Sequence, residues 1–391
     1  MIDSQNLPHL LKYMGSKREL LPFVINSIES LNTDSVWLCD LFSGTSIVGC
    51  SLKDKFNIHS NDIQSYSSIF SNTYLQNLNR LIDPKSLEQI ENKILFYVDE
   101  FSKKYEHFSF EYKYISSFEE LIEIEEKQQN LINLKFDVGF NLFTKYYSGT
   151  YWSFNQCVWI DSIRAIAEEY KGYPEYYVIL SSLIYAMSYT SQGTGHFAQF
   201  RDVTESNMDD IMKYRNRSIW PYFQRKFIEL VSNVNYDTNR EYKITNLDYI
   251  DCLRIIDNNT IVYADPPYSS VHYSRFYHAI ETLVKYDYPQ VKYKGRYRED
   301  RHQSPFGKKT EVVNAFRLLF ECIKARKSHM VLSYSDNGMI TQNEIFSLGK
   351  EIFGSGYLGE IQTKEYIHSK MGRSDEHVMD VNEIIISYKR I

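Results

Sequence analysis

Four stretches of this 391-residue chain place an acidic side chain directly after an apolar run of the kind that forms buried strands. The acids are Asp40 in "WLCDLFSG", Asp62 in "FNIHSNDIQ", Asp248 in "ITNLDYI" and Asp265 in "IVYADPPY". Ligands bind at the carboxyl ends of the strands in open parallel sheets, so we expect these carboxylates to surround one site. A single acid after a strand is often only a helix N-cap. The occurrence of all four in this order is what indicates a ligand-binding site.

The tetrapeptide Asp265-Pro266-Pro267-Tyr268 combines a carboxylate, a rigid backbone and an aromatic ring. Two adjacent prolines fix two φ angles and remove two N–H donors. The exocyclic amine of adenine is a poor nucleophile because its lone pair is conjugated with the ring. A carboxylate and a backbone carbonyl that accept its two N–H groups would favour a tetrahedral nitrogen, so positioning and electrostatics would supply the catalysis. A proline-rich structural turn is the alternative interpretation of this tetrapeptide alone.

The turn from Asp40 to Gly44 has the properties of a ligand-binding loop. Glycine lets the backbone turn tightly beneath a ligand, and a following helix points its N-terminus at it. The turn lacks the Gly-x-Gly-x-x-Gly and Gly-Lys-Ser/Thr patterns of phosphate-binding loops, whereas Asp62 follows at about the spacing of an acid that binds ribose hydroxyls. A nucleoside cofactor without phosphates fits best, which indicates S-adenosylmethionine.

These motifs resemble those of the DNA adenine-N6 methyltransferases of the Dam-like group. The family begins with a Lys-aromatic-x-Gly-x-Lys segment, present here as "KYMGSK" at 12–17, followed by an acid-x-Phe-x-Gly turn, present at 40–44. Asp62 and the tetrapeptide at 265–268 complete the match. The resemblance implies site-specific methylation of adenine N6 in double-stranded DNA, within a restriction-modification or related system that includes a cognate restriction endonuclease. Tyr268 would stack on the flipped-out base.

The resemblance also implies which residues bind the cofactor. Asp62 would hold the ribose, Asp248 would contact the adenine end, and Lys17 would lie near the carboxylate. The turn at 40–44 would form the wall around the methionine part. The sequence departs from the family at Ser46, where a second glycine is frequent, so we expect the next helix to pack slightly further away. The expected cofactor-binding residues are Tyr13, Gly15, Lys17, Asp40, Phe42, Gly44, Asp62 and Asp248.

Two stretches combine basic and aromatic residues, a composition that suits contact with phosphates and unstacked bases. Residues 213–226 hold five basic residues and no acid, and residues 292–327 hold eleven basic and four acidic residues. A loop at 191–202, between two helical patterns, is a further candidate to reach a groove. A solvated helix face is the alternative for each basic stretch. The expected DNA contacts are His196, Gln199, Arg201, Arg215, Arg217, Arg296 and Arg298.

Strands and helices must position these residues, and their order predicts the fold class. Strand-like runs at 35–44 and 56–64 enclose a helical pattern, and strand patterns return at 240–250, 259–268 and 328–338. This order predicts an α/β protein with a doubly wound, mostly parallel sheet. The resemblance implies that it is the Rossmann-like methyltransferase fold.

The region between the strand-rich segments is helical and rich in polar and aromatic residues. We therefore expect a catalytic core formed by 1–64 and 241–391, with an inserted, mainly helical target-recognition domain at 65–240. Residues 359–390 contain two strand-like runs around a charged loop. This pattern predicts a C-terminal antiparallel hairpin at the edge of the sheet.

Composition narrows the class of protein. The net charge is −6, so any basic DNA-binding face must be local. No signal peptide or membrane-spanning run is visible, which predicts a cytoplasmic protein without a membrane partner. The five cysteines are dispersed, so we expect buried free thiols and no metal site. Two alternatives stay open: a catalytically silent DNA-binding protein that retains the fold, and a cytosine-N4 methyltransferase, in which serine usually replaces the acid at position 265.

Overall fold

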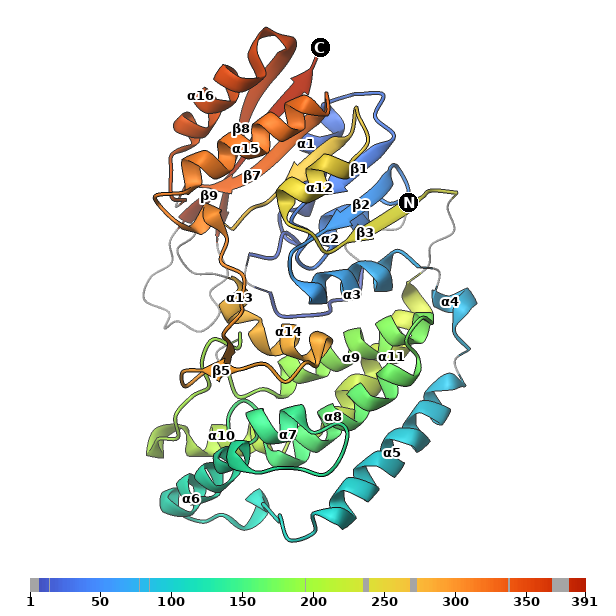
Figure 1. Cartoon of the computed structure of the whole chain (residues 1–391), viewed down its shortest axis with the longest axis vertical. Helices are drawn as coiled ribbons and strands as arrows, with labels where there is room; N and C mark the ends of the chain where they lie inside the picture. The colour runs from blue at the N-terminus through green and yellow to red at the C-terminus, as the bar shows by residue number, and fades with distance from the viewer. Residues whose placement is uncertain are drawn as a thin grey trace.

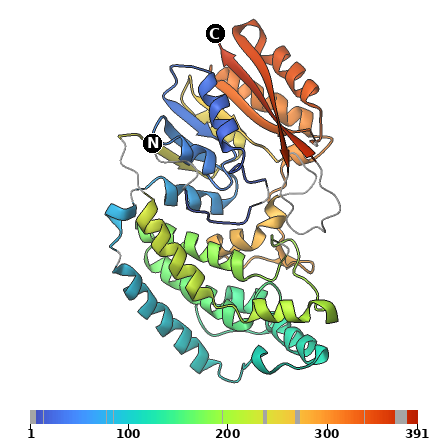
Figure 2. The same ribbon diagram turned by 180° about the vertical axis from the view of Figure 1, so that it is seen from behind.

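The computed structural model has a part built around a β-sheet and a part built from helices, which follow each other along the longest axis of the molecule (Figure 1). The C-terminus lies on the sheet part (Figure 2). None of the helices in the described residues is both long enough and apolar enough to cross a membrane. The structure describes residues 7–13, 15–76, 78–83, 85–193, 195–234, 239–267, 273–336, 338–367 and 380–391.

A mixed sheet of seven strands forms the first part, in the order β3-β2-β1-β4-β7-β9-β8. The first five strands of this order are parallel, and β9 runs antiparallel to both of its neighbours. The expected α/β class with a mostly parallel sheet is therefore confirmed. The strands are β1 (Trp37–Asp40), β2 (Asn57–Asn61), β3 (Tyr242–Thr245), β4 (Ile261–Ala264), β7 (His329–Ser335), β8 (Tyr357–Ile367) and β9 (Asp380–Arg390).

Helices cover both faces of this sheet, which explains why β4 and β7 are buried along their whole length. Alternate residues of β1, β4, β7 and β9 belong to two separate apolar clusters, one on each face. One face packs against α1 (Leu21–Ser30), α2 (Ile47–Ser51) and α3 (Ser65–Tyr74). The other packs against α12 (Tyr249–Ile255), α15 (Val312–Ala325) and α16 (Gln342–Phe353).

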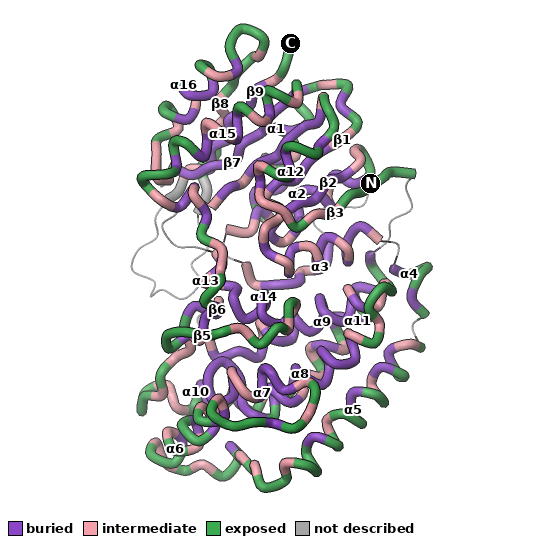
Figure 3. Tube along the Cα trace, viewed as in Figure 1, coloured by how far each residue is buried: buried purple, intermediate pink, exposed green. Residues whose placement is uncertain are grey.

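The second part is built around α9, whose sequence is apolar on nearly every side and which is buried by its neighbours (Figure 3). The capping boxes at Ser117 and Ser153 fix the starts of two of the surrounding helices. The helices are α4 (Leu78–Leu81), α5 (Ser86–Lys104), α6 (Phe118–Gln129), α7 (Leu142–Tyr147), α8 (Phe154–Glu169), α9 (Pro174–Thr190), α10 (Met208–Arg215) and α11 (Ile219–Asn233).

The segment after β4 also joins the helical part, which the expected boundary at residue 241 does not include. Arg164 Nε donates to the carbonyl of Leu283 at 3.0 Å, and Tyr286 Oη donates to Asp161 Oδ1 at 2.5 Å. The segment comprises α13 (Tyr273–Phe276), α14 (His278–Lys285), β5 (Val291–Lys292) and β6 (Tyr297–Arg298). Short 3-10 helices lie at Tyr112–Tyr114, Asn130–Asn133, Glu205–Asn207, Pro305–Gly307 and Gly354–Gly356.

Candidate active site

One pocket lies at the carboxyl ends of β1, β2 and β4, where the strand order reverses between β1 and β4. All eight residues that we expect to bind the cofactor line it, and so do Asp265, Pro266 and Pro267. The structure therefore brings together residues that are up to about 250 positions apart in sequence. Tyr268 lies outside the described residues.

Asp40 lines the pocket and is almost completely buried. Its Oδ2 accepts a hydrogen bond from Gly49 N in the first turn of α2, at 2.9 Å. The amides of a first helical turn have no partner within the helix, so the carboxylate satisfies one of them. A side chain at Gly49 would place its Cβ only 3.1 Å from Asp40 Oδ2. The glycine thus permits the close approach of the helix to β1.

Asp62 holds the glycine turn in place. Its Oδ2 accepts from Gly44 N at 2.9 Å and its Oδ1 accepts from Gln64 N at 2.8 Å. Gly44 has a φ of +51°, in the left-handed region that favours glycine, and a Cβ there would lie 3.3 Å from Tyr13 Oη. A carboxylate has about four lone-pair sites, so both oxygens of Asp62 can still accept hydroxyl donors from a ligand.

Ser46 also has a left-handed backbone, with a φ of +60°. Its side chain is buried, and its Oγ lies 2.6 Å from Ser71 Oγ and 3.4 Å from the carbonyl of Ser67. The expectation that this departure makes α2 pack slightly further away stays a prediction. Ser46 keeps the conformation that glycine adopts easily, its hydroxyl contacts α3, and the close approach of α2 to the sheet occurs at Gly49.

Asp248 caps a helix and also lines the pocket. Its Oδ1 accepts from Ile250 N at 3.0 Å, so it is the N-cap of α12. A helix cap and a ligand contact are compatible because one oxygen serves each.

Lys17 connects Asp265 with a carboxylate that the sequence analysis missed. Its Nζ lies 3.2 Å from Asp265 Oδ1 and 2.7 Å from Glu383 Oε1. Ser333 Oγ also donates to Glu383. Lys17 is buried, whereas lysines close to the start of a helix are usually exposed to solvent. A signal for Glu383 exists in the sequence, because it is an acid within the apolar strand "NEIIISY".

Burial raises the pKa of three of the carboxyl groups around the pocket. The pKa of Asp40 is raised to about 7, with a further contribution from the negative charges of Asp265 and Asp62. The pKa values of Asp62 and Asp265 are each raised to about 6, again mainly by burial. Lys17 opposes this increase at Asp265, and Glu383 adds to it. A cation bound among these groups would favour their ionised forms.

Aromatic rings form two walls of the pocket. Tyr13 stacks on Tyr277 with ring centroids 4.6 Å apart, and on Tyr273 at 5.6 Å. Phe42 contacts Tyr249 at 5.9 Å and meets Phe306 edge-on at 5.6 Å. The sequence analysis did not single out these partners, because they come from segments that are distant in the chain. Flat apolar walls of this kind suit the rings of a nucleoside.

Two expected DNA contacts lie in the interior instead. The Arg215 side chain is buried, and its Nε and Nη2 donate to Glu125, the Nε to Oε1 at 2.8 Å. Arg298 donates to both oxygens of Asp287, at 2.6 and 2.7 Å, and is likewise buried. Buried guanidinium groups that are paired with carboxylates are not available to phosphate, so we withdraw both residues from the DNA face. The local charge pattern did not predict this pairing. Glu125 is distant in the sequence from Arg215, and the acids near Arg298 are fewer than the basic residues around them.

The other expected DNA contacts are at least partly accessible. Gln199 is exposed, and His196, Arg201 and Arg217 are half-buried. Arg217 lies over the Tyr214 ring, with its Cζ 3.8 Å from the centroid. Arg296 is half-buried, but its guanidinium donates to two backbone carbonyls, those of Gln129, at 2.9 Å, and Tyr146. These bonds link segments within the protein.

A family model described as D12 class N6 adenine-specific DNA methyltransferase matches residues 13–347 of the chain, a range that includes every residue lining the pocket. The chain belongs to this family. The class of adenine-N6 DNA methyltransferases that the motifs predict is thereby confirmed. The methyltransferase family generally uses S-adenosylmethionine.

Several curated proteins are similar to this D12-class chain. Modification methylase LlaI of Lactococcus lactis subsp. lactis is 25% identical over 390 residues, which cover 97% of this chain and 55% of that protein. Type II methyltransferase M.FokI of Planomicrobium okeanokoites is 27% identical, over 87% of this chain and 47% of that protein. The chain thus spans about half the length of these relatives. Type II methyltransferase M.NlaIII of Neisseria lactamica is 22% identical, over 93% of this chain and 94% of that protein.

The donor set of the pocket fits S-adenosylmethionine. Four aspartates line it, at 40, 62, 248 and 265, and the lysine in its wall is engaged by Asp265 and Glu383. Acceptors of this kind suit ribose hydroxyls, an ammonium group and a positively charged sulfur, and they repel phosphates. The aromatic walls suit the adenine ring.

Proposed function

We propose that this protein is a site-specific DNA methyltransferase that transfers the methyl group of S-adenosylmethionine to adenine N6, within a restriction-modification system. One observation carries the proposal. Asp265 follows β4 at the reversal point of the sheet, in the same pocket as the residues expected to hold the cofactor. The names of the relatives, a modification methylase and type II methyltransferases, support the biological setting. A cognate restriction endonuclease is the partner that this setting implies.

In this proposal the chain's own groups prepare the amine for attack. S-Adenosylmethionine supplies an electrophilic methyl group on a positively charged sulfur. Asp265 and the carbonyl of Pro266 accept the two N6 hydrogens, so the nitrogen lone pair faces the pocket. When the N6–methyl bond has formed, the positively charged nitrogen loses one proton to Asp265 or to water. Lys17 keeps Asp265 in the ionised form that this role requires, because an adjacent positive charge lowers a carboxyl pKa.

A group of basic and aromatic side chains beside the pocket supports a DNA-binding face. Lys12 precedes the pocket residue Tyr13, and its Nζ lies 4.3 Å from the centroid of the Tyr189 ring. The positive charge of Arg217 contributes to lowering the pKa of Lys12, after burial as the main cause. Cations close enough to affect each other's titration attract a phosphate backbone together. We propose that Lys12 and Arg217 contact DNA, together with His196, Gln199 and Arg201.

The activity is tested directly with purified protein, labelled S-adenosylmethionine and genomic DNA from a host that does not modify its DNA. We expect N6-methyladenine after digestion to nucleosides. Asp265→Asn keeps the shape of the side chain but loses its charge, and should abolish transfer while cofactor binding persists. The matched control is Asp83→Asn, at an exposed turn whose Oδ1 accepts from Lys85 N. Absence of methyladenine on varied DNA would refute the proposal.

Two other outcomes would identify the alternatives. N4-methylcytosine as the product would make the protein a cytosine methyltransferase. Binding of DNA and cofactor without transfer to any base would make it a silent DNA-binding protein. The intact acid at position 265 favours the adenine enzyme over both, because the cytosine enzymes usually carry serine there.

A further inference from the structure

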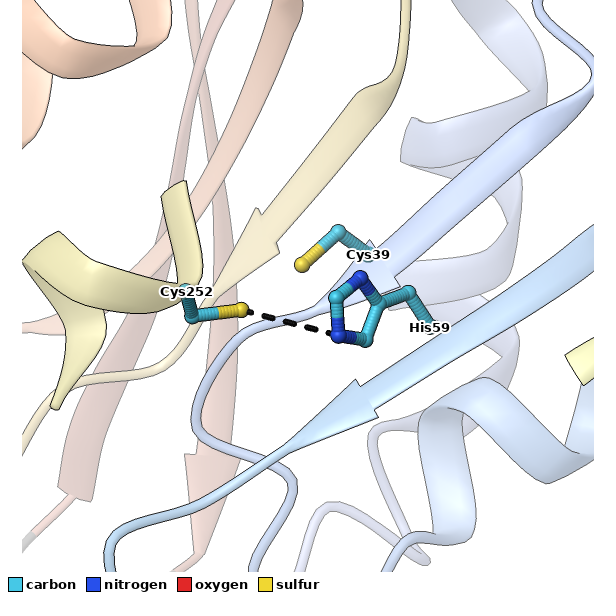
Figure 4. Close-up of side chains that lie close together, drawn as sticks. All are labelled: Cys39, His59 and Cys252. Carbon is cyan, nitrogen blue, oxygen red and sulfur yellow. Dashed lines mark hydrogen bonds between the residues drawn. The ribbon is translucent and has the colours of Figure 1, made fainter. Parts of the chain in front are cut away.

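Three side chains that looked unrelated in the sequence converge between the sheet and α12: Cys39, His59 and Cys252 (Figure 4). One ligand atom from each of them, two thiol sulfurs and a ring nitrogen, lies within 4.8 Å of the other two. All three residues are buried. Cys39 and His59 are register partners on the neighbouring strands β1 and β2, and Cys252 comes from the helix that covers this face.

The separations suit a single tetrahedral ion. Zinc bonds of about 2.3 Å to sulfur and about 2.0 Å to nitrogen place tetrahedral ligand atoms about 3.5 to 3.8 Å apart. Cys252 Sγ lies 3.9 Å from His59 Nε2. The hydroxyl of Thr245 is beside the same group, 2.9 Å from His59 Nε2 and 4.0 Å from Cys252 Sγ. Thr245 donates its hydrogen to Asn61 Oδ1 at 2.7 Å, which leaves its lone pairs for a fourth ligand position.

The charge of such a site also balances. Two thiolates and a neutral imidazole carry two negative charges, which one divalent cation neutralises. An uncompensated charge is costly in a buried apolar cluster such as the one that holds Cys39 and Cys252. Thiolate and imidazole ligands favour zinc-type cations over magnesium or calcium, which prefer oxygen.

We propose that Cys39, His59 and Cys252 bind one zinc-type divalent cation that fastens β1, β2 and α12 to each other. This role goes beyond the proposed methyl transfer. Each ligand lies close in sequence to an acid of the pocket: Cys39 precedes Asp40, His59 lies three residues before Asp62, and Cys252 lies four after Asp248. Side chains alternate along a strand, so Cys39 and Asp40 face opposite sides of β1. The ion would therefore hold β1, β2 and α12 in place next to the pocket, and none of its three ligands lines the pocket itself.

The test measures metal directly and does not depend on methylation. Protein purified from cells grown with added zinc should contain one equivalent of zinc per chain, measured by inductively coupled plasma mass spectrometry. Protein stripped of metal and titrated with Co²⁺ should develop thiolate-to-cobalt charge-transfer absorption and saturate at one equivalent. Its melting temperature should rise on addition of one equivalent of zinc, since binding to the folded state stabilises it.

Cys252→Ser should reduce bound zinc at least tenfold and remove the cobalt absorption. Cys157→Ser is the matched control, a buried free cysteine in α8 of the helical part, and should leave both unchanged. If Cys252→Ser does not fold, the wild-type cobalt titration alone decides. Wild-type protein that neither contains zinc nor develops cobalt absorption would overturn the proposal. So would an intact-mass measurement that shows Cys39 and Cys252 joined in a disulfide.

Discussion

The ion network around Asp265 makes a prediction about the pH dependence of the reaction. Lys17 Nζ is 3.2 Å from Asp265 Oδ1 and 2.7 Å from Glu383 Oε1, so one ammonium group serves two carboxylates. Asp265 is a stronger hydrogen-bond acceptor when it is ionised, and only then can it take up the proton that the product loses. Its pKa is raised to about 6. Activity is therefore present above this pKa and is lost as the pH falls through it. Changes to either neighbour of Asp265 should move that midpoint.

Lys17→Met removes the positive charge and should raise the pKa of Asp265. An opposite charge at this distance lowers a carboxyl pKa by about 1 to 3 units, so its loss would move the value from about 6 to between about 7 and 9. With a pKa of about 8, only about a quarter of Asp265 is ionised at about pH 7.5, so the rate falls roughly fourfold, and it recovers near pH 9. Glu383→Gln removes a like charge and should move the midpoint below about 6.

The assay is the single-turnover rate of methyl transfer as a function of pH, because slow product release can hide the chemical step. Lys53→Met is the control. Lys53 is also buried, it donates to the carbonyl of Tyr74 at 3.0 Å, and it is outside the pocket lining. The reasoning is refuted if Lys17→Met lowers the rate equally at every pH, or if both pocket variants move the midpoint in the same direction.

Four further results are expected. Gly44→Ala should weaken cofactor binding and lower the free energy of unfolding by about 1–2 kcal/mol, because its backbone is left-handed. Gly172 also has a positive φ, but no atom lies within 4 Å of the Cβ that a substitution would add, so Gly172→Ala should leave cofactor affinity unchanged. Calorimetry compares the two variants. Arg215→Ala should lower the free energy of unfolding in urea by about 3–5 kcal/mol, because it leaves Glu125 buried without its partner. S-Adenosylmethionine affinity should fall as the pH is lowered from about 8 to 5.5, since the carboxyl groups of Asp40 and Asp62, with pKa values of about 7 and about 6, become protonated. The demethylated product, whose sulfur is uncharged, should show a weaker fall in equilibrium dialysis. Arg217→Ala should weaken DNA binding and reduce its salt slope by about 1, whereas the exposed Arg254→Ala should change neither in a fluorescence titration.

The sequence was sufficient to predict that the four pocket acids meet. Asp40, Asp62, Asp248 and Asp265 each follow a strand, and parallel strands present their carboxyl ends at one edge. The sequence does not predict pairings that need the order of strands in space. Glu383 reaches Lys17, and through it the charge of Asp265, because β9 inserts between β7 and β8, a placement that local patterns do not encode.

Charge patterns were a weaker guide, for a physical reason. A cluster of arginines attracts phosphate only where its members are not already neutralised. Arg215 is paired with Glu125, ninety residues earlier, and Arg298 with Asp287. A local count of charges cannot show a partner as remote as Glu125, and it does not show that an acid counted in the same stretch, Asp300, is already paired with Arg298. The count therefore overestimated the basic face. Spacing along the chain was also a weak guide to the cysteines, because dispersed residues converge in space when neighbouring strands align Cys39 with His59.

The acids of the pocket also have a structural role, which limits what their substitution can prove. Asp40 accepts from Gly49, Asp62 from Gly44 and Gln64, and Asp248 from Ile250. Removal of any of them would both disturb the backbone of the pocket and remove a ligand contact. Asp265 differs, because the contacts that fix its charge are side-chain contacts through Lys17. Substitutions at 17, 265 and 383 are therefore the ones that separate the chemistry of transfer from the folding of the site.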